Sequence, residues 1–437
     1  MTLILKNAII LDVKKQQKIQ RSIVIDSDGN IQHVFSSNEI ETYLDHSTEA
    51  KVMDCEGYYI SPGLINAHAH LFASGKPLNK KVNPTFLKLG YKLLSTKIGN
   101  FCVKNIMKRN ALIELQNGVT TLRSLGEFFY QDVSLRDEFI QKRKVAPTLL
   151  VAGFFLSTTD GHGAPYLALE GDSPWEGRKN VRKNIKKGVD WIKICVTGGV
   201  TDAKKLGEAG SLQLTEEEIK AICSEAHKNN TSVAAHVEST EGVRIALKGG
   251  VDTIEHGAEM DEEIIELFKN NPYSLKGYSS LVPTFQAAAP FALLKPELTG
   301  LNNITYINGK SIYYSMLKGY QQALGNNISF GIGNDASMSF VTHYDFWREL
   351  RLHKKLGSQN NFEIIKAATL QNAKLLNIDK EYGSIEIGKK ADLLITSKDP
   401  TIDLKNLSEI VSVFKHGQPV AQYKYKKYKN LDTLLDI

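Results

Sequence analysis

Residues 61–70 read SPGLINAHAH, an apolar run that follows a Pro-Gly turn and ends in His68 and His70. In a β-strand, residues two apart point to the same face of the sheet, so these two imidazoles lie side by side. Imidazole nitrogens are common ligands of zinc and related metals. The segment therefore predicts a strand that carries a pair of metal ligands at its end.

Downstream of this strand, short apolar runs alternate with segments of helical periodicity. One such segment, 215–229, begins at Thr215 with Glu218 three residues later, the pattern of a capping box. Repeated alternation of this kind predicts parallel strands covered by helices, and a (β/α)8 barrel fits the length. The expected strands lie at 120–122, 148–151, 191–195, 232–235, 253–254 and 329–332.

The two chain ends have a different texture from the middle. They consist of β-branched or apolar clusters separated by polar turns, which predicts short strands without intervening helices. These clusters lie at 3–5, 8–11, 22–25 and 31–34 near the N-terminus, and at 391–395 and 410–414 near the C-terminus.

The composition of the 437-residue chain is ordinary for a globular protein, with 42% hydrophobic residues, 23% charged residues and a net charge of +6. This mild charge predicts no nucleic-acid partner. No apolar stretch approaches the ~20 residues that span a bilayer, so we expect no membrane partner. Scattered cysteines and the absence of a signal-peptide pattern predict reduced thiols and a cytoplasmic protein. The oligomeric state stays open, a homo-oligomer included.

Three further polar residues, His236, His256 and Asp335, each end a short apolar run. Singly, each of them also fits an ordinary buried or loop residue. In a barrel, however, the carboxyl ends of the strands and their loops form the active-site face. We therefore expect these three side chains to meet His68 and His70 at one end of the barrel.

Lys193 lies inside the apolar run 191–195, where an ammonium is costly to bury. One interpretation is a lysine whose stem crosses the core while its head reaches solvent. In the other, desolvation lowers the pKa, and the neutral amine adds carbon dioxide. The resulting carbamate is a carboxylate that can bridge two divalent metal ions.

The order H-x-H, strand-embedded Lys, His, His and Asp resembles the amidohydrolase superfamily across nearly the whole chain. Several flanking segments resemble the branch that contains imidazolonepropionase-like proteins and metal-dependent, prolidase-like dipeptidases. These segments are GVTTLR at 118–123, GHG at 161–163, KICVTGGV at 193–200, GVDTIEHG at 250–257 and the tail GSIEIGKKADL at 383–393.

The resemblance implies an α/β fold, namely a distorted (β/α)8 TIM barrel with a small β-sandwich domain built from both chain ends. We place the composite β-domain at 1–60 and 383–437 and the barrel at 61–382.

The resemblance also implies two divalent metal ions, of which zinc is the first choice and manganese, iron or cobalt stay open. His68 and His70 would bind one ion, and His236 and His256 the other. Carboxylated Lys193 would bridge the two ions, with the carbamate derived from carbon dioxide. Asp335 would contact the first ion.

These roles predict hydrolysis of a small-molecule amide, such as a dipeptide, an N-acyl amino acid or a cyclic amide. Hydroxide bridging the two metals would attack the carbonyl, with Asp335 as general base and then acid. His162, in the GHG loop, is expected to contact the substrate and help polarise its carbonyl. The alternatives are ester hydrolysis, mononuclear deamination, imidazolonepropionase-type hydrolysis and a non-catalytic binding protein. Lys193 argues against deamination, and the presence of all six candidate ligands argues against a non-catalytic binding protein.

Two more residues are candidate substrate contacts. Arg123 ends an early strand and would bind an anionic group, with a structural salt bridge as its alternative. Glu238 stands where dipeptidase relatives usually have Tyr or His, and would pair with a cationic substrate or cap the following helix. A second departure is Asn334, where the family pattern Gly-Thr-Asp has Thr. We expect Asn334 to alter the positioning of Asp335, while Asp335 retains its function.

Overall fold

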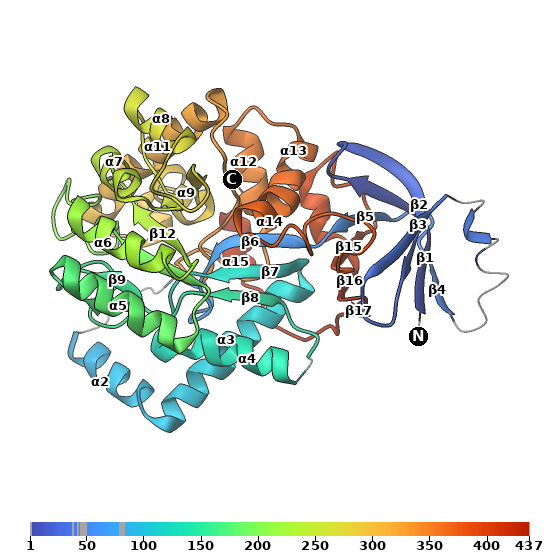
Figure 1. Cartoon of the computed structure of the whole chain (residues 1–437), viewed down its shortest axis with the longest axis horizontal. Coiled ribbons are helices and arrows are strands. Elements are labelled where there is room, and N and C mark those ends of the chain that lie inside the picture. The colour runs from blue at the N-terminus through green and yellow to red at the C-terminus, as the bar shows by residue number, and fades with distance from the viewer. Residues whose placement is uncertain are drawn as a thin grey trace.

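The computed structural model describes residues 2–36, 39–41, 43, 50–77, 84–142 and 144–436. Within them, parallel strands and their covering helices form one large part of the molecule. An eight-stranded sheet forms a smaller part beside it (Figure 1). The alternation of strands and helices that the sequence predicts for the middle of the chain is found in the larger part.

The smaller part joins strands from both ends of the chain in one mixed sheet. Its order is β17-β16-β15-β5-β1-β2-β3, with β4 paired to β1. The strands are β1 (Thr2–Asp12), β2 (Gln17–Ile25), β3 (Ile31–Phe35), β4 (Ala50–Asp54), β5 (Tyr59–Pro62), β15 (Leu393–Thr396), β16 (Ile410–Lys415) and β17 (Gln418–Pro419). Its junction is β5, which pairs with β1 in parallel and with β15 antiparallel. A second layer that would make this sheet a sandwich, and the domain boundaries, stay predictions.

The larger part contains two parallel sheets with helices against them. One has the order β6-β7-β8 and the other β10-β9-β11-β12-β13-β14. Every pairing within both sheets is parallel, and most of the strands are almost entirely buried. The strands are β6 (Leu64–Ala69), β7 (Val119–Ser124), β8 (Thr148–Val151), β9 (Phe155–Ser157), β10 (Ala168–Glu170), β11 (Trp191–Cys195), β12 (Ser232–Val237), β13 (Thr253–His256) and β14 (Ser280–Val282).

The segment predicted as a strand at 329–332 is not a regular strand. Its backbone hydrogen-bonds to Leu281 of β14 on one side and to Ala67 of β6 on the other, and Asp335 beyond it bonds to the His68 carbonyl. Only the isolated bridges Leu281–Phe330 and Ala69–Ala336 form. The left-handed backbone at Asp335, with φ of 60°, interrupts the ladder. The fold is therefore α/β and barrel-like, and a fully closed barrel stays a prediction.

The helices alternate with the strands along the chain and pack around the strands of the larger part (Figure 1). The predicted helix at 215–229 is confirmed as α6, with Thr215 as N-cap and a capping box to Glu218. The helices are α2 (Pro84–Leu94), α3 (Lys97–Gln116), α4 (Gln131–Gln141), α5 (Pro174–Lys187), α6 (Glu216–His227), α7 (Thr240–Gly249), α8 (Glu262–Lys269), α9 (Phe285–Leu293), α10 (Pro296–Thr299), α11 (Asn303–Gly325), α12 (Trp347–Leu356), α13 (Asn361–Lys366), α14 (Asn372–Leu375) and α15 (Lys429–Leu434).

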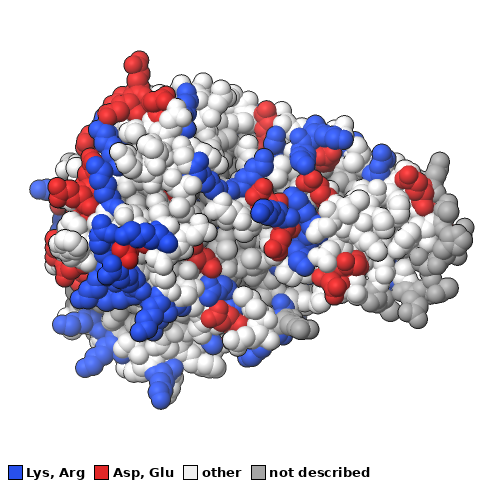
Figure 2. Space-filling view, viewed as in Figure 1, with Lys and Arg blue, Asp and Glu red and all other residues white. Residues whose placement is uncertain are grey.

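The surface carries both signs of charge, and lysine and arginine gather over α5 (Figure 2). There Arg178 and Arg182 pair with Glu225 of α6, so this basic run is a solvated helix face. All four cysteines are free, and Cys102 is the exposed one. No helix in the described part of the chain is long and apolar enough to cross a membrane.

Candidate metal centre

His68 and His70 lie at the carboxyl end of β6, as the sequence predicts. His68 Nδ1 donates to Glu255 Oε2 at 2.8 Å, and His70 Nδ1 donates to the Gly126 carbonyl at 2.8 Å. Such contacts fix the ring orientation and leave Nε2 free, which is the usual state of a metal-binding histidine. Both rings are buried, so they are held in place as a preformed pair.

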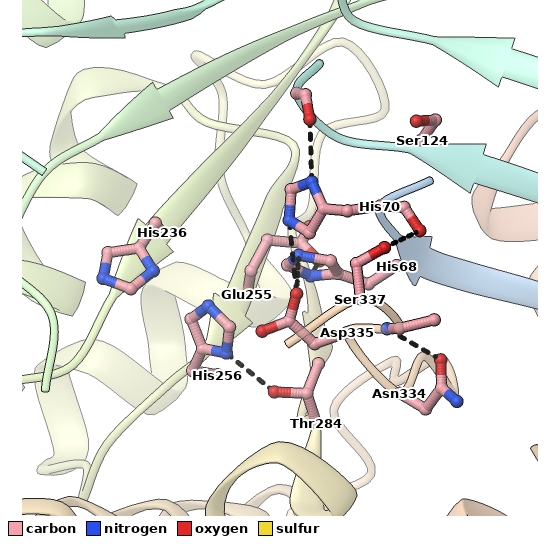
Figure 3. A network of polar contacts seen from close by, with 12 residues as sticks. His68, His70, Ser124, His236, Glu255, His256, Thr284, Asn334, Asp335 and Ser337 are labelled. Carbon is pink, nitrogen blue, oxygen red and sulfur yellow. Dashed lines mark hydrogen bonds and ion pairs between the residues drawn. The ribbon is translucent and has the colours of Figure 1, made fainter. Parts of the chain in front are cut away.

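Asp335 lies between these rings and His256 (Figure 3). Its Oδ1 is 3.4 Å from His68 Nε2 and 3.2 Å from His70 Nε2. Burial opposes ionisation, but His68, His70 and His256 outweigh it and hold the pKa of Asp335 below its ordinary value. The close approach of the segment before Asp335 to β6 requires glycine at position 333, because a Cβ there would lie 2.5 Å from the backbone nitrogen of His68.

Asn334, the departure from the family pattern, is hydrogen-bonded to side chains next to this site. Its Oδ1 accepts from Asn66 Nδ2 at 2.8 Å, and its amide nitrogen donates to Gln286 Oε1 at 3.3 Å. The amide therefore links the segment before Asp335 to β6, which gives the Asn a positioning role.

His236 and His256 end β12 and β13, with ring centroids 4.6 Å apart. His256 Nδ1 lies 2.7 Å from Thr284 Oγ1, and Nε2 of His236 is buried without a hydrogen-bond partner. Burial lowers the pKa of His256 to about 4 and that of His236 well below its ordinary value. Both rings are therefore neutral at pH 7, the form that binds metals.

The backbone is strained at this centre. His256 and Asp335 both adopt left-handed φ values, 69° and 60°. Such conformations are uncommon for non-glycine residues and cost about 1–3 kcal/mol each. They persist where the surrounding structure holds them, and they concentrate at functional sites.

Lys193, in β11, lies beside the strand of His236, and the residue is 2% exposed. Its head therefore does not reach solvent, so the solvent-reaching interpretation does not fit. No carboxylate pairs with its ammonium among the residues that the structure describes. Burial is the main cause that lowers the pKa of Lys193, which favours the neutral amine.

Arg123 lies in the core, where it contacts β6 and β13. The side chain is fully buried, and its NH2 donates to Glu255 Oε1 at 2.8 Å while Nε donates to the Ala67 carbonyl at 2.6 Å. Its guanidinium also stacks over Trp191, 4.4 Å from the ring centroid. This placement favours the salt-bridge alternative over a substrate contact.

Glu255 is a functional residue that the sequence interpretation missed. Its carboxylate holds His68 on one side and Arg123 on the other. The available signal was a charged residue inside an apolar strand, the same signal that singled out Lys193.

His162 lies over the second histidine pair. Its ring stacks on His236 with centroids 4.1 Å apart and 9° between the planes, and its Nδ1 hydrogen-bonds to Asp202. Asp202 was also missed, because it lies in a polar loop without periodicity. The structure thus brings His162 to the centre, where a substrate contact is feasible.

Glu238 follows β12 and also faces this pair. Its Oε1 lies 4.0 Å from His236 Nε2, and its Oε2 is buried without a partner. Burial, with Asp202 and Asp335 nearby, raises the pKa of Glu238 to about 8. The helix α7 is capped by Ser239, whose Oγ accepts from the Gly242 amide, so Glu238 is not the cap.

The donor set fits a divalent cation. Ligand atoms of His68, His256 and Asp335 all lie within 4.8 Å of one another. His236 Nε2 and Asp335 Oδ1 are buried without hydrogen-bond partners, and such atoms call for an ion or water. Imidazole and carboxylate ligands suit zinc and its neighbours.

A barrel-like α/β fold with buried imidazoles and a carboxylate at its strand ends defines a class of metal-binding enzymes. Comparison with known families makes the class specific, because the Amidohydrolase family model matches residues 59–420. The chain therefore belongs to the amidohydrolase family, whose members generally bind divalent metals. This confirms the predicted resemblance and the predicted class of hydrolytic enzymes acting on C–N bonds.

Three similar proteins are informative. A solved structure from Bifidobacterium longum named "putative prolidase" has 37% identity and a TM-score of 0.86, covering 100% of this chain and 98% of that one. A Xaa-Pro dipeptidase structure has 27% identity and a TM-score of 0.80, covering 96% and 99%. Ochratoxinase of Aspergillus niger is 28% identical over 335 residues, and the match spans 70% of this chain but only 66% of ochratoxinase.

Proposed function

We propose that this protein is a binuclear metal-dependent hydrolase that cleaves an amide bond of a small molecule. The observation that carries the proposal is Lys193, a lysine buried among candidate ligands with no carboxylate paired to it in the described residues. An unpaired buried ammonium is very costly, so the site calls for another chemical state of this side chain.

The carbamate of Lys193 supplies that state. The neutral amine adds to the carbon of carbon dioxide, the N–C bond forms, and one proton passes to solvent. The product carries one negative charge on two oxygens and has the span of a bridging carboxylate. His68, His70 and Asp335 would hold one ion on one side of it, and His236 with His256 would hold the other.

The side chains around the ions have separate tasks. When bound, two divalent ions, with zinc as first choice, would supply a nucleophilic hydroxide at neutral pH and a Lewis acid for the carbonyl. Asp335 would accept the proton that the nucleophile loses on attack and return it to the leaving nitrogen as the C–N bond breaks. His162, held by Asp202, contacts the carbonyl side of the substrate.

The substrate classes that fit are a dipeptide, an N-acyl amino acid and a cyclic amide. Dipeptide cleavage is favoured because two similar structures, at 37% and 27% identity, are named as a putative prolidase and a Xaa-Pro dipeptidase. We also retain the closed (β/α)8 barrel, the β-sandwich at 1–60 with 383–437 and a cytoplasmic location as parts of this proposal.

A mononuclear deaminase or an imidazolonepropionase-type hydrolase is the second candidate. Either would use the same barrel end without the bridge. A buried lysine without an ion pair has no evident task in such a site, so Lys193 favours the binuclear enzyme.

Metal content per chain tests the proposal. Wild-type protein should hold about two ions, and Lys193→Ala should hold clearly fewer. Lys276→Ala is the matched control, because Lys276 is a partly buried lysine that donates to the Leu375 carbonyl, away from the centre. One ion that is insensitive to Lys193→Ala would favour the deaminase, and no metal at all would favour a non-catalytic binding protein.

A further inference from the structure

We propose that Glu238, with Asp202 beside it, forms a subsite for a cationic group of the substrate, an ammonium or a guanidinium. The inference rests on the proposed function and narrows its substrate class. Substrates with a free amine are then preferred over substrates whose amine is acylated.

The position of Glu238 places its carboxylate at the reacting centre. It follows β12 two residues after His236, and its Oε1 is 4.0 Å from His236 Nε2. Its backbone amide donates to Thr197 Oγ1 at 3.0 Å. Gly210 packs on its carbonyl so closely that a Cβ there would lie 2.6 Å from the oxygen. The backbone is therefore fixed, and the side chain has a defined direction.

The two ordinary tasks of such a carboxylate are absent here. Ser239, not Glu238, caps α7, since Ser239 Oγ accepts from the Gly242 amide at 3.3 Å. Within the described part of the chain, no lysine or arginine forms an ion pair with Glu238. The side chain is only 11% exposed, and Oε2 has no hydrogen-bond partner. A buried carboxyl oxygen of this kind calls for a hydrogen-bond donor, and a cationic donor is the one that also stabilises its ionised form.

The charged groups around Glu238 reinforce this requirement. Asp202 and Asp335 are its charged neighbours, and both are acidic. Asp202 Oδ2 is already bonded to His162 and to the Gly199 amide at 3.1 Å, and its charge adds negative potential beside Glu238. A cation arriving with the substrate would satisfy Glu238 directly.

The chemistry of peptides supplies such a cation at short range. In a dipeptide with a free N-terminus, the ammonium is separated from the scissile carbonyl by one carbon. A carboxylate close to the second histidine pair is therefore placed to receive it while the carbonyl lies at the centre. A lysine or arginine side chain offers the same chemistry at longer range.

The test compares Glu238→Gln with wild type on matched substrates: a dipeptide, its N-acetyl form, and an N-acetyl dipeptide with a lysine side chain. Glu238→Gln should raise KM for the free-amine dipeptide about 10- to 100-fold, because one charge-assisted hydrogen bond is lost. The KM of the plain N-acetyl dipeptide and the metal content should not change. A selective effect on the lysine substrate instead would place the cation on the side chain.

Binding measured without turnover keeps the two proposals separate. Calorimetry with alaninamide and N-acetylalaninamide should show tighter binding of the free amine to wild type, and loss of that preference in Glu238→Gln. Glu241→Gln is the control, since Glu241 is exposed on α7. Loss of metal in Glu238→Gln, equal losses on all substrates, or a preference for N-acetyl ligands would each overturn the subsite. Failure of the hydrolase proposal would instead appear as absent turnover by metal-loaded wild type.

Discussion

Two buried lysines, Lys415 in the terminal sheet and Lys193 in the barrel, differ in what their ammonium groups contact. Lys415 is 3% exposed and donates to Asp392 and, at 2.7 Å, to Thr148 Oγ1. Lys193 is 2% exposed, and no carboxylate pairs with it in the described part of the chain. The ammonium of Lys415 therefore has an ion-pair partner within the fold, whereas that of Lys193 has none among the described residues.

The same contrast extends to the groups around each lysine. Both oxygens of Asp392 are occupied, because Oδ1 accepts from the His416 amide at 2.9 Å. At the barrel end, His236, Glu238 and Asp335 each have a buried polar atom without a partner. Buried polar atoms without partners occur elsewhere in the described chain as well, but here they converge with imidazole and carboxylate side chains, which indicates a site that awaits a ligand.

Replacing Asp335 by Asn is expected to have the largest effect of all. The amide keeps the shape but cannot accept a proton from water, so kcat for a dipeptide substrate should fall about 10³-fold. The measurement is kcat with metal content determined on the same sample. A variant that keeps its metal and more than a tenth of its activity would show that Asp335 is not the general base.

Substituting methionine for each of the two lysines is expected to affect stability and metal binding differently. Lys415→Met leaves Asp392 buried and unpaired, so the free energy of unfolding should fall by about 3–5 kcal/mol. Lys193→Met removes an amine that has no ion-pair partner, so metal-free protein should change by less than about 1 kcal/mol. The Lys193 variant should instead lose metal.

Urea unfolding of both variants after chelation measures this difference. Wild type treated in the same way is the reference, since bound metal would itself add stability. Equal destabilisation by the two substitutions would mean that Lys193 is structural and would contradict its assignment as the bridge.

Arg123→Met tests an intermediate case, because Arg123 is a buried charge that is ion-paired to Glu255, the residue that holds the candidate ligand His68. Glu255 would keep His68 and Thr253 as partners, so the loss of stability should be smaller, on the order of 2–3 kcal/mol. Metal affinity should fall about 10-fold through the loosened His68. If only KM for an anionic substrate changed, Arg123 would be the substrate contact after all.

Much of the fold follows from local pattern. The strands β11 and β8 were predicted at the residues where they occur, and α6 began at its capping residue, because apolar runs and capping boxes act within a few residues. The segment 329–332 was predicted as a strand but forms only isolated bridges. Its irregularity comes from Gly333 packing on His68 and from the backbone turn at Asp335, which are long-range and conformational facts.

The candidate site was predictable to the extent that its residues follow or end short apolar runs of the sequence. His68, His70, His236, His256 and Asp335 share that feature, and barrel topology brings strand ends together. Glu255 and Asp202 were missed, because their tasks depend on which side chain lies opposite them. Arg123 shows the converse, since its strand position was clear while its direction into the core was not.

Asp132 is a third kind of buried charge and gives the smallest expected effect. It is fully buried, and its Oδ2 accepts from the Gly153 amide at 2.8 Å, but no cation pairs with it in the described residues. Burial raises its pKa to about 6, above an unfolded value of about 3.9. Between these values the folded protein keeps a proton that the unfolded chain has lost, so the free energy of unfolding falls as pH rises.

Asp132→Asn removes this dependence, because an amide does not titrate and still accepts from Gly153. Between about pH 5 and pH 7, the wild type should lose about 1 kcal/mol of stability that the variant retains. Urea unfolding of chelated protein at several pH values measures the two slopes. Identical slopes would mean that Asp132 is ionised throughout. An unpaired buried charge would then be tolerated away from the metal centre, which would weaken the inference drawn from Lys193.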